Sequence, residues 1–137
     1  MGQRVLVIED EPNITAAIGF ILVRDGWEVR THAHGADALE VIRATAPDLV
    51  ILDVMLPGRS GIDILQALRA EADTARLPVL MLSAKGQTRD RELAERCGAS
   101  RFIAKPFSND ALRAAVREMM APPADAAAAL ARSGAAR

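Results

Sequence analysis

The chain has 137 residues, of which 50% are hydrophobic and 26% are charged, and its formal net charge is -1. This length suits one domain with a buried core, and the weak net charge gives no reason to expect attraction to nucleic acid or to an acidic membrane surface. A single cysteine excludes an internal disulfide, and no apolar run is long enough to span a bilayer, so we expect a cytoplasmic protein that contacts neither nucleic acid nor membrane.

The first predicted elements begin at residue 5. Residues 5–8 form a continuous apolar run, which is typical of a strand buried on both faces. A helix is expected from about Pro12, because proline suits the first helical position, and it should stop at Gly26. A more polar strand is expected near residues 27–31. The helix after it should end before Pro47, whose ring would clash with a continuing helix.

The second half of the chain continues this alternation. Residues 49–52 and 79–82 are further continuous apolar runs, and a helix that starts from Ser60 lies between them. A fourth helix is expected before a short fifth strand at residues 102–104. The last helix should start at Ser108, a residue type that caps helix N-termini.

Five strands that alternate with helices predict an α/β protein, whose parallel sheet is covered by helices on both faces. The polar second strand and the short fifth strand suit the sheet edges, so the first, third and fourth strands should lie in the middle. After residue 120 the composition changes to Pro122-Pro123 and then to an alanine-rich stretch. We therefore expect one domain over residues 1–120 and a flexible C-terminal tail over residues 121–137.

Polar residues follow four of the predicted strands. Glu9 and Asp10 follow the first strand, Asp53 the third, Ser83 the fourth and Lys105 the fifth. In an open α/β sheet, ligands bind beyond the carboxyl ends of the strands, where the strand order reverses. We therefore expect these five residues to converge on one site.

The chemistry of these residues favours phosphoryl transfer. Crowded carboxylates raise one another's pKa unless a cation offsets their charge, and a hard divalent ion with oxygen ligands, Mg²⁺ or Mn²⁺, would do so. Asp53 could then attack phosphorus as a carboxylate nucleophile without a general base. Lys105 and Ser83 could each bind one of the peripheral phosphoryl oxygens.

Four short motifs carry these residues, in this order: Glu9-Asp10, Asp53 to Gly61, Ser83-Ala84 and Lys105-Pro106-Phe107. Together they resemble the signature of receiver domains from the response regulators of two-component signalling, over about residues 3–120. The resemblance implies a doubly wound, flavodoxin-like fold with strand order 2-1-3-4-5.

The resemblance also implies how the phosphoryl group and the metal would be bound. Asp53 would be the phosphoacceptor, and Lys105 would be its ion-pair partner. Asp10 and Asp53 would bind Mg²⁺ directly, together with the carbonyl of Met55. Glu9 would act through a coordinated water molecule.

By the same resemblance, two residues would form a switch. Ser83, which is followed by Ala84 in its motif, would move its hydroxyl towards the phosphoryl group. This movement would leave room for the ring of Phe102 to turn inward. The Lys105-Pro106 peptide bond is expected to be cis, as it is in relatives.

These features predict a single-domain phosphoacceptor, which takes its phosphoryl group from a histidine kinase or a histidine phosphotransfer protein and signals by protein contact. Beyond its own Mg²⁺-dependent phosphorylation and dephosphorylation we expect no enzyme activity, and no output domain fits after Met120. The face formed by the fourth helix, fifth strand and fifth helix is expected to bind an acidic partner, with a solvated face as the alternative. Its arginines are Arg89, Arg91, Arg96, Arg101, Arg113 and Arg117.

Two other functions remain open from the sequence. The chain could be an interaction module that keeps the fold without being phosphorylated. It could also be an aspartyl-phosphate hydrolase of the haloacid dehalogenase type, although these enzymes carry a second carboxylate at the position that Met55 occupies here. A dinucleotide-binding fold is excluded, because Glu-Asp-Glu-Pro follows the first strand instead of a glycine-rich loop.

Overall fold

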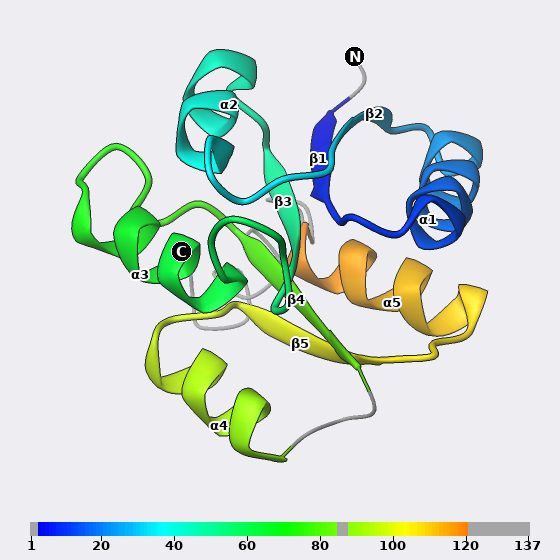
Figure 1. Cartoon of the computed structure of the whole chain (residues 1–137). Helices are drawn as coiled ribbons and strands as arrows, with labels where there is room; N and C mark the ends of the chain where they lie inside the picture. The colour runs from blue at the N-terminus through cyan, green and yellow to red at the C-terminus, as the bar shows by residue number, and fades with distance from the viewer. Residues whose placement is uncertain (1–2, 85–87, 121–137) are drawn as a thin grey trace, which may run out of the picture.

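The computed structural model describes residues 3–84 and 88–120, and the predicted tail at residues 121–137 lies outside the described residues. Five strands alternate with five helices along the described part of the chain (Figure 1). The strands are β1 (Arg4–Ile8), β2 (Glu28–His32), β3 (Leu49–Asp53), β4 (Val79–Ala84) and β5 (Arg101–Lys105). The helices are α1 (Pro12–Arg24), α2 (Ala38–Thr45), α3 (Gly61–Ala70), α4 (Thr88–Arg96) and α5 (Asn109–Met119).

The sheet has the predicted topology. All neighbouring strands are parallel, and their order is β2-β1-β3-β4-β5. The three continuously apolar strands therefore lie in the middle, and the two more polar strands are the edges. Figure 1 shows α1 and α5 on one face of the sheet and α2, α3 and α4 on the other. The predicted α/β class and strand order are both confirmed.

Each face of the sheet has its own hydrophobic core, because successive residues of a strand point to opposite faces. On β3, Leu49 and Ile51 pack with the buried residues of α1 and α5, whereas Val50 and Leu52 pack with those of α2, α3 and α4. All four of these side chains are fully buried. This double burial explains why the central strands are apolar without interruption.

The predicted helix starts agree with the structure. The hydroxyl oxygen of Ser60 accepts a hydrogen bond from the backbone N–H of Asp63 at 3.1 Å, and that of Ser108 accepts one from Ala111 at 3.0 Å. Both serines are N-caps, and α1 begins at Pro12 as expected. None of the helices in the described ranges is long and apolar enough to cross a membrane.

Both edge strands differ slightly from the prediction. β5 extends by one residue at each end, since Arg101 is in register with Leu80 and Lys105 with Ala84 of the neighbouring strand. β2 begins and ends one residue later than expected. The ends of these strands are set by backbone pairing with the neighbouring strand, and the polarity of the side chains does not reveal where this pairing stops.

The start of α3 lies directly against the end of β3. A Cβ atom added to Gly61 would lie 2.1 Å from the backbone carbonyl oxygen of Asp53, so no side chain fits there. The N–H of Gly61 also donates a hydrogen bond of 2.8 Å to the carbonyl of Val54. The absence of a side chain at position 61 therefore allows α3 to hold the segment that carries Asp53.

Candidate functional site

The carboxyl ends of the parallel strands bring the predicted residues to one rim of the sheet. Glu9 and Asp10 directly follow β1, while Asp53 and Lys105 are the last residues of β3 and β5. Ser83 is the penultimate residue of β4 and is buried. The sequence predicted this convergence from the topology alone.

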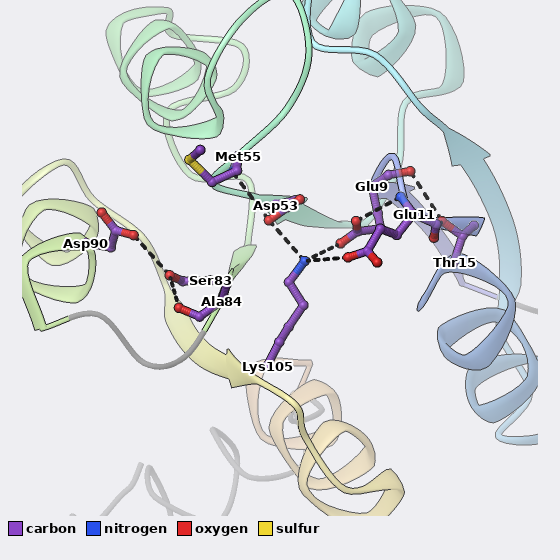
Figure 2. Close-up of polar contacts among 9 residues, drawn as sticks. All are labelled: Glu9, Glu11, Thr15, Asp53, Met55, Ser83, Ala84, Asp90 and Lys105. Carbon is purple, nitrogen blue, oxygen red and sulfur yellow. Dashed lines mark hydrogen bonds and ion pairs between the residues drawn. The ribbon is translucent and has the colours of Figure 1, made fainter. Parts of the chain in front are cut away.

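Lys105 connects the carboxyl groups at this rim (Figure 2). Its Nζ atom lies 3.1 Å from Oε1 of Glu9 and 3.4 Å from Oδ1 of Asp53, and 4.0 Å from Oε1 of Glu11. The side chains of Glu9 and Asp53 are only 0% and 3% exposed, so the ammonium group pairs with two carboxyl groups that are shielded from water. The Lys105–Pro106 peptide bond is cis, as the resemblance implied.

Glu9 is held in place by its own loop. Its Oε2 atom accepts a hydrogen bond of 3.0 Å from the backbone N–H of Glu11. The Thr15 hydroxyl on α1 lies 3.2 Å from the backbone carbonyl oxygen of Glu9 and 3.1 Å from that of Glu11. Since Lys105 contacts the other carboxyl oxygen, both oxygens of the Glu9 side chain have a partner.

The pKa of Asp53 is raised to about 6 from its ordinary value of 3.8. Burial is the main cause, because it disfavours the charged form, and repulsion from Glu9 adds to the effect. The charge of Lys105 and the backbone N–H of Met55, which lies 3.4 Å from Oδ1, act in the opposite direction. Above pH 6, Asp53 is therefore a carboxylate that lacks full compensation for its charge.

The pKa of Lys105 is raised above the ordinary value of a lysine. Burial alone would lower it, but the hydrogen bond to Glu9 and the negative charges of Asp53 and Glu9 outweigh burial. The lysine side chain thus stays protonated at neutral pH and supplies a fixed positive charge at the rim.

Three carboxyl groups lie close enough to share a cation. One oxygen from each of Glu9, Asp10 and Asp53 lies within 4.8 Å of the others, with Asp10 exposed and the other two buried. An oxygen-only donor set suits Mg²⁺ or Mn²⁺, and the uncompensated charge of Asp53 favours a cation there. Met55 is 70% exposed, and its backbone N–H lies next to the carboxyl group of Asp53.

The two predicted switch residues both contact α4. The Ser83 hydroxyl lies 3.1 Å from Oδ2 of Asp90 and 3.4 Å from the carbonyl of Ala84 (Figure 2). Phe102 on β5 is half-buried, and the guanidinium carbon of Arg91 lies 5.9 Å from the centre of its ring. Sequence reasoning did not single out Asp90, since an acidic residue in the first turn of a helix is common.

A pocket of about 360 Å³ opens beside Lys105, between α1 and the segment that joins β5 to α5. Ile14 and Ala17 of α1 form one side of the pocket, and Pro106 and Phe107 form the other. Lys105 lines this pocket, whereas Asp53 does not.

The predicted arginine face requires a correction. Arg117 lies 2.5 Å from Asp25, which follows α1, so its guanidinium faces α1 and not α4. Arg101 pairs with Glu118 within the chain. These two ion pairs neutralise part of the positive charge on which the prediction of an acidic partner was based. The face is therefore less positive than its number of arginines suggests.

Comparison with known proteins agrees with this geometry. The family model for the response regulator receiver domain matches residues 5–117. The DNA-binding response regulator MtrA of Mycolicibacterium smegmatis is 39% identical over 117 residues, which are 85% of this chain and 50% of MtrA. The phosphate regulon transcriptional regulatory protein PhoB of Rhizobium meliloti is 38% identical over 120 residues, or 88% of this chain and 53% of PhoB.

The chain spans about half the length of these two relatives. MtrA is a DNA-binding protein by name, so the absence of nucleic-acid contacts stays a prediction for this chain.

Solved structures of receiver domains share the fold. The BeF3-activated N-terminal receiver domain of RstA from Klebsiella pneumoniae superposes with a TM-score of 0.79 at 30% identity, covering 85% of this chain and 97% of that domain. The family match extends over most of the chain and includes every residue at the rim. The chain therefore belongs to the response regulator receiver domain family.

Proposed function

We propose that this chain is a phosphoacceptor switch, in which Asp53 takes a phosphoryl group from a phosphohistidine of a histidine kinase or of a histidine phosphotransfer protein. The observation that carries the proposal is the arrangement of Asp53, which ends a central strand with a lysine ammonium 3.4 Å from its Oδ1 atom.

In the transfer, a carboxylate oxygen of Asp53 forms a bond to phosphorus while the bond between phosphorus and the donor nitrogen breaks. The electron pair of that bond stays on the imidazole nitrogen, and the product on this chain is an aspartyl phosphate. Because the nucleophile is already an anion above pH 6, no base has to remove a proton from it. Attack by water would later break the bond between Asp53 and phosphorus, which returns the carboxylate and releases inorganic phosphate.

A divalent cation fits the acidic rim. Asp10 and Asp53 would hold Mg²⁺ or Mn²⁺ through their carboxylates together with the carbonyl of Met55, and Glu9 would act through a water molecule. When bound, the ion supplies positive charge to the carboxylates and to one phosphoryl oxygen.

Lys105 and Ser83 have separate tasks in this proposal. The ammonium group of Lys105 neutralises a second phosphoryl oxygen, at a position where it already contacts Asp53. The Ser83 hydroxyl donates a hydrogen bond to a third oxygen, and Phe102 turns inward into the space that this movement opens. The change then reaches a partner protein through the face formed by α4, β5 and α5.

Residues 1–120 form the receiver unit in this proposal, and residues 121–137 form a tail that takes no part in phosphoryl transfer. The family match from residue 5 to residue 117 supports the extent of the unit. Output through protein contact, without direct binding of nucleic acid, is part of the same proposal.

Intact mass spectrometry after incubation with acetyl phosphate and Mg²⁺ tests the phosphoacceptor. Wild type should gain one phosphoryl group, and so should Asp73→Asn, which changes an exposed carboxyl group of the same type. Asp53→Asn should gain none, and a chelator should abolish the gain. Phosphate release that depends on Asp53, without a visible adduct, would still support the proposal with fast hydrolysis.

The proposal is overturned if wild type gains no phosphoryl group and releases no phosphate from the donor. An interaction module without phosphorylation would then be the better description. An adduct on Asp53→Asn would show that the acceptor is another residue.

A further inference from the structure

The Ser83 hydroxyl is already engaged in this structure. A serine hydroxyl carries a single proton and can donate only one full hydrogen bond at a time. The better acceptor of the two within reach is Oδ2 of Asp90 at 3.1 Å, since the carbonyl of Ala84 is 3.4 Å away and belongs to the next residue. Because Ser83 is 1% exposed, its hydroxyl has little access to water as an alternative partner.

The next residue of α4 contacts the second switch residue. Arg91 places its guanidinium carbon 5.9 Å from the ring centre of Phe102, within the range of a cation–π contact. Consecutive residues at the start of α4 thus hold the hydroxyl on β4 and the aromatic ring on β5. Figure 2 shows the first of these contacts, with the Ser83 hydroxyl directed towards α4.

We propose that Asp90 is a positioning residue that keeps the Ser83 hydroxyl on α4 in the unphosphorylated protein. This inference rests on the proposed function, because it concerns the step in which Ser83 turns to a phosphoryl group on Asp53. The Ser83 proton cannot serve Asp90 and the phosphoryl oxygen together, so activation exchanges one hydrogen bond for the other. Asp90 thereby lowers the population of the active state before phosphorylation.

The exchange has a consequence at α4. When the Ser83 hydroxyl turns towards the phosphoryl group, the Asp90 carboxyl group loses this hydrogen bond. The contact between α4 and β4 is then weaker, close to the place where Phe102 must move. The two switch residues are then coupled through one helix start, since adjacent residues of α4 hold both of them.

A purely structural role for Asp90 must be separated from this one. Asp90 lies in the first turn of α4, where an acidic side chain stabilises a helix through its dipole. Loss of that effect would change the stability of α4 whether or not Ser83 carries a hydroxyl. Removal of the Ser83 hydroxyl therefore distinguishes the two roles, because only the proposed role depends on it.

The affinity for beryllofluoride in the presence of Mg²⁺ provides the test. This compound mimics a phosphoryl group on a carboxylate, and ¹⁹F NMR titration measures its binding to the whole chain. Asp90→Ala should bind it about threefold to tenfold more tightly than wild type, because one competing hydrogen bond to a carboxyl group is removed. Asp90→Asn keeps an oxygen acceptor, so its affinity for beryllofluoride should lie between those of wild type and Asp90→Ala. Glu92→Ala removes the same charge from an exposed position of the same helix, and its affinity for beryllofluoride should equal that of wild type.

The same titration with the Ser83→Ala variant and with the double variant Ser83→Ala, Asp90→Ala completes a double-mutant cycle. Without the hydroxyl, Asp90→Ala should no longer change the affinity. The inference is overturned if Asp90→Ala binds like wild type, or if its effect is the same in both backgrounds, as helix stability or net charge would produce.

The wild-type titration separates this inference from the proposed function. Binding by wild type but not by Asp53→Asn supports the phosphoacceptor site whatever Asp90 does. Failure of wild type to bind beryllofluoride would overturn the proposed function, and the role of Asp90 with it.

Discussion

Replacing Asp53 by asparagine should stabilise the metal-free protein at neutral pH, although it removes the proposed phosphoacceptor. The pKa of Asp53 rises from 3.8 to about 6 on folding, mainly because the carboxyl group is buried and secondly because Glu9 repels it. Each pKa unit corresponds to about 1.4 kcal/mol, so ionisation of Asp53 costs the folded state about 3 kcal/mol. Asparagine has nearly the same shape and carries no charge, so the variant avoids this cost.

The effect should depend on pH in a defined window. Because the pKa is higher in the folded than in the unfolded state, the protonated carboxyl group stabilises the fold below pH 4. This contribution is lost as the pH rises through about 6. The gain in free energy of unfolding for Asp53→Asn should therefore be complete above pH 7, and it should shrink as the pH falls from 6 to 4.

Urea unfolding in the presence of a chelator measures this difference. Trp27 is the only tryptophan of the chain and is packed, half-buried, against the core beneath α1 and α5, so its fluorescence reports unfolding of the domain. Asp73→Asn, at an exposed position, is the control and should change little. Added Mg²⁺ should stabilise wild type more than Asp53→Asn. Equal stability of the two proteins at pH 7.5, or a gain that is undiminished at pH 4, would refute the reasoning.

Other substitutions test the fold around the site. Gly61→Ala should lower the free energy of unfolding by about 2 kcal/mol or more, because its Cβ would lie 2.1 Å from the carbonyl oxygen of Asp53. Gly19→Ala, with no atom within 4 Å of the new Cβ on α1, should instead raise it by about 0.5–1 kcal/mol, and equal urea midpoints for the two variants would contradict this. Ser60→Ala removes the N-cap of α3 and should cost about 1 kcal/mol in the same assay. Lys105→Met leaves two buried carboxyl groups without their cation, so it should cost about 3 kcal/mol at pH 7.5 and slow phosphorylation by acetyl phosphate. Unchanged values for both quantities would show that the ammonium group is dispensable.

The sheet was predictable because burial on both faces leaves a strong signal in the sequence. Residues 49–52 and 79–82 are apolar without interruption, and only central strands of a parallel sheet require this. The rim followed from topology, since Asp53 and Lys105 end parallel strands whose carboxyl ends must lie on the same side. Distances between side chains were not needed for either prediction.

Contacts that depend on how a helix lies against the sheet could not be predicted in this way. Asp90 is seven residues from Ser83, and only the placement of α4 brings its carboxyl group to the hydroxyl. Arg117 on α5 and Asp25, which follows α1, are 92 residues apart, and the relative placement of the two helices has no local sequence signal. The arginine face was overestimated for the same reason, because the sequence shows charges but not their partners.

The ion pair between Glu9 and Lys105 joins residues that are 96 positions apart, near the two ends of the described chain. Glu9 follows β1, which is synthesised first among the five described strands, whereas Lys105 ends β5, which is synthesised last among them. A nascent chain that has not yet placed β5 beside β4 therefore lacks the cation that offsets its buried acidic groups. In the proposed function, competence to receive a phosphoryl group is therefore delayed until β5 has been synthesised, because Lys105 is the last of the rim residues along the chain.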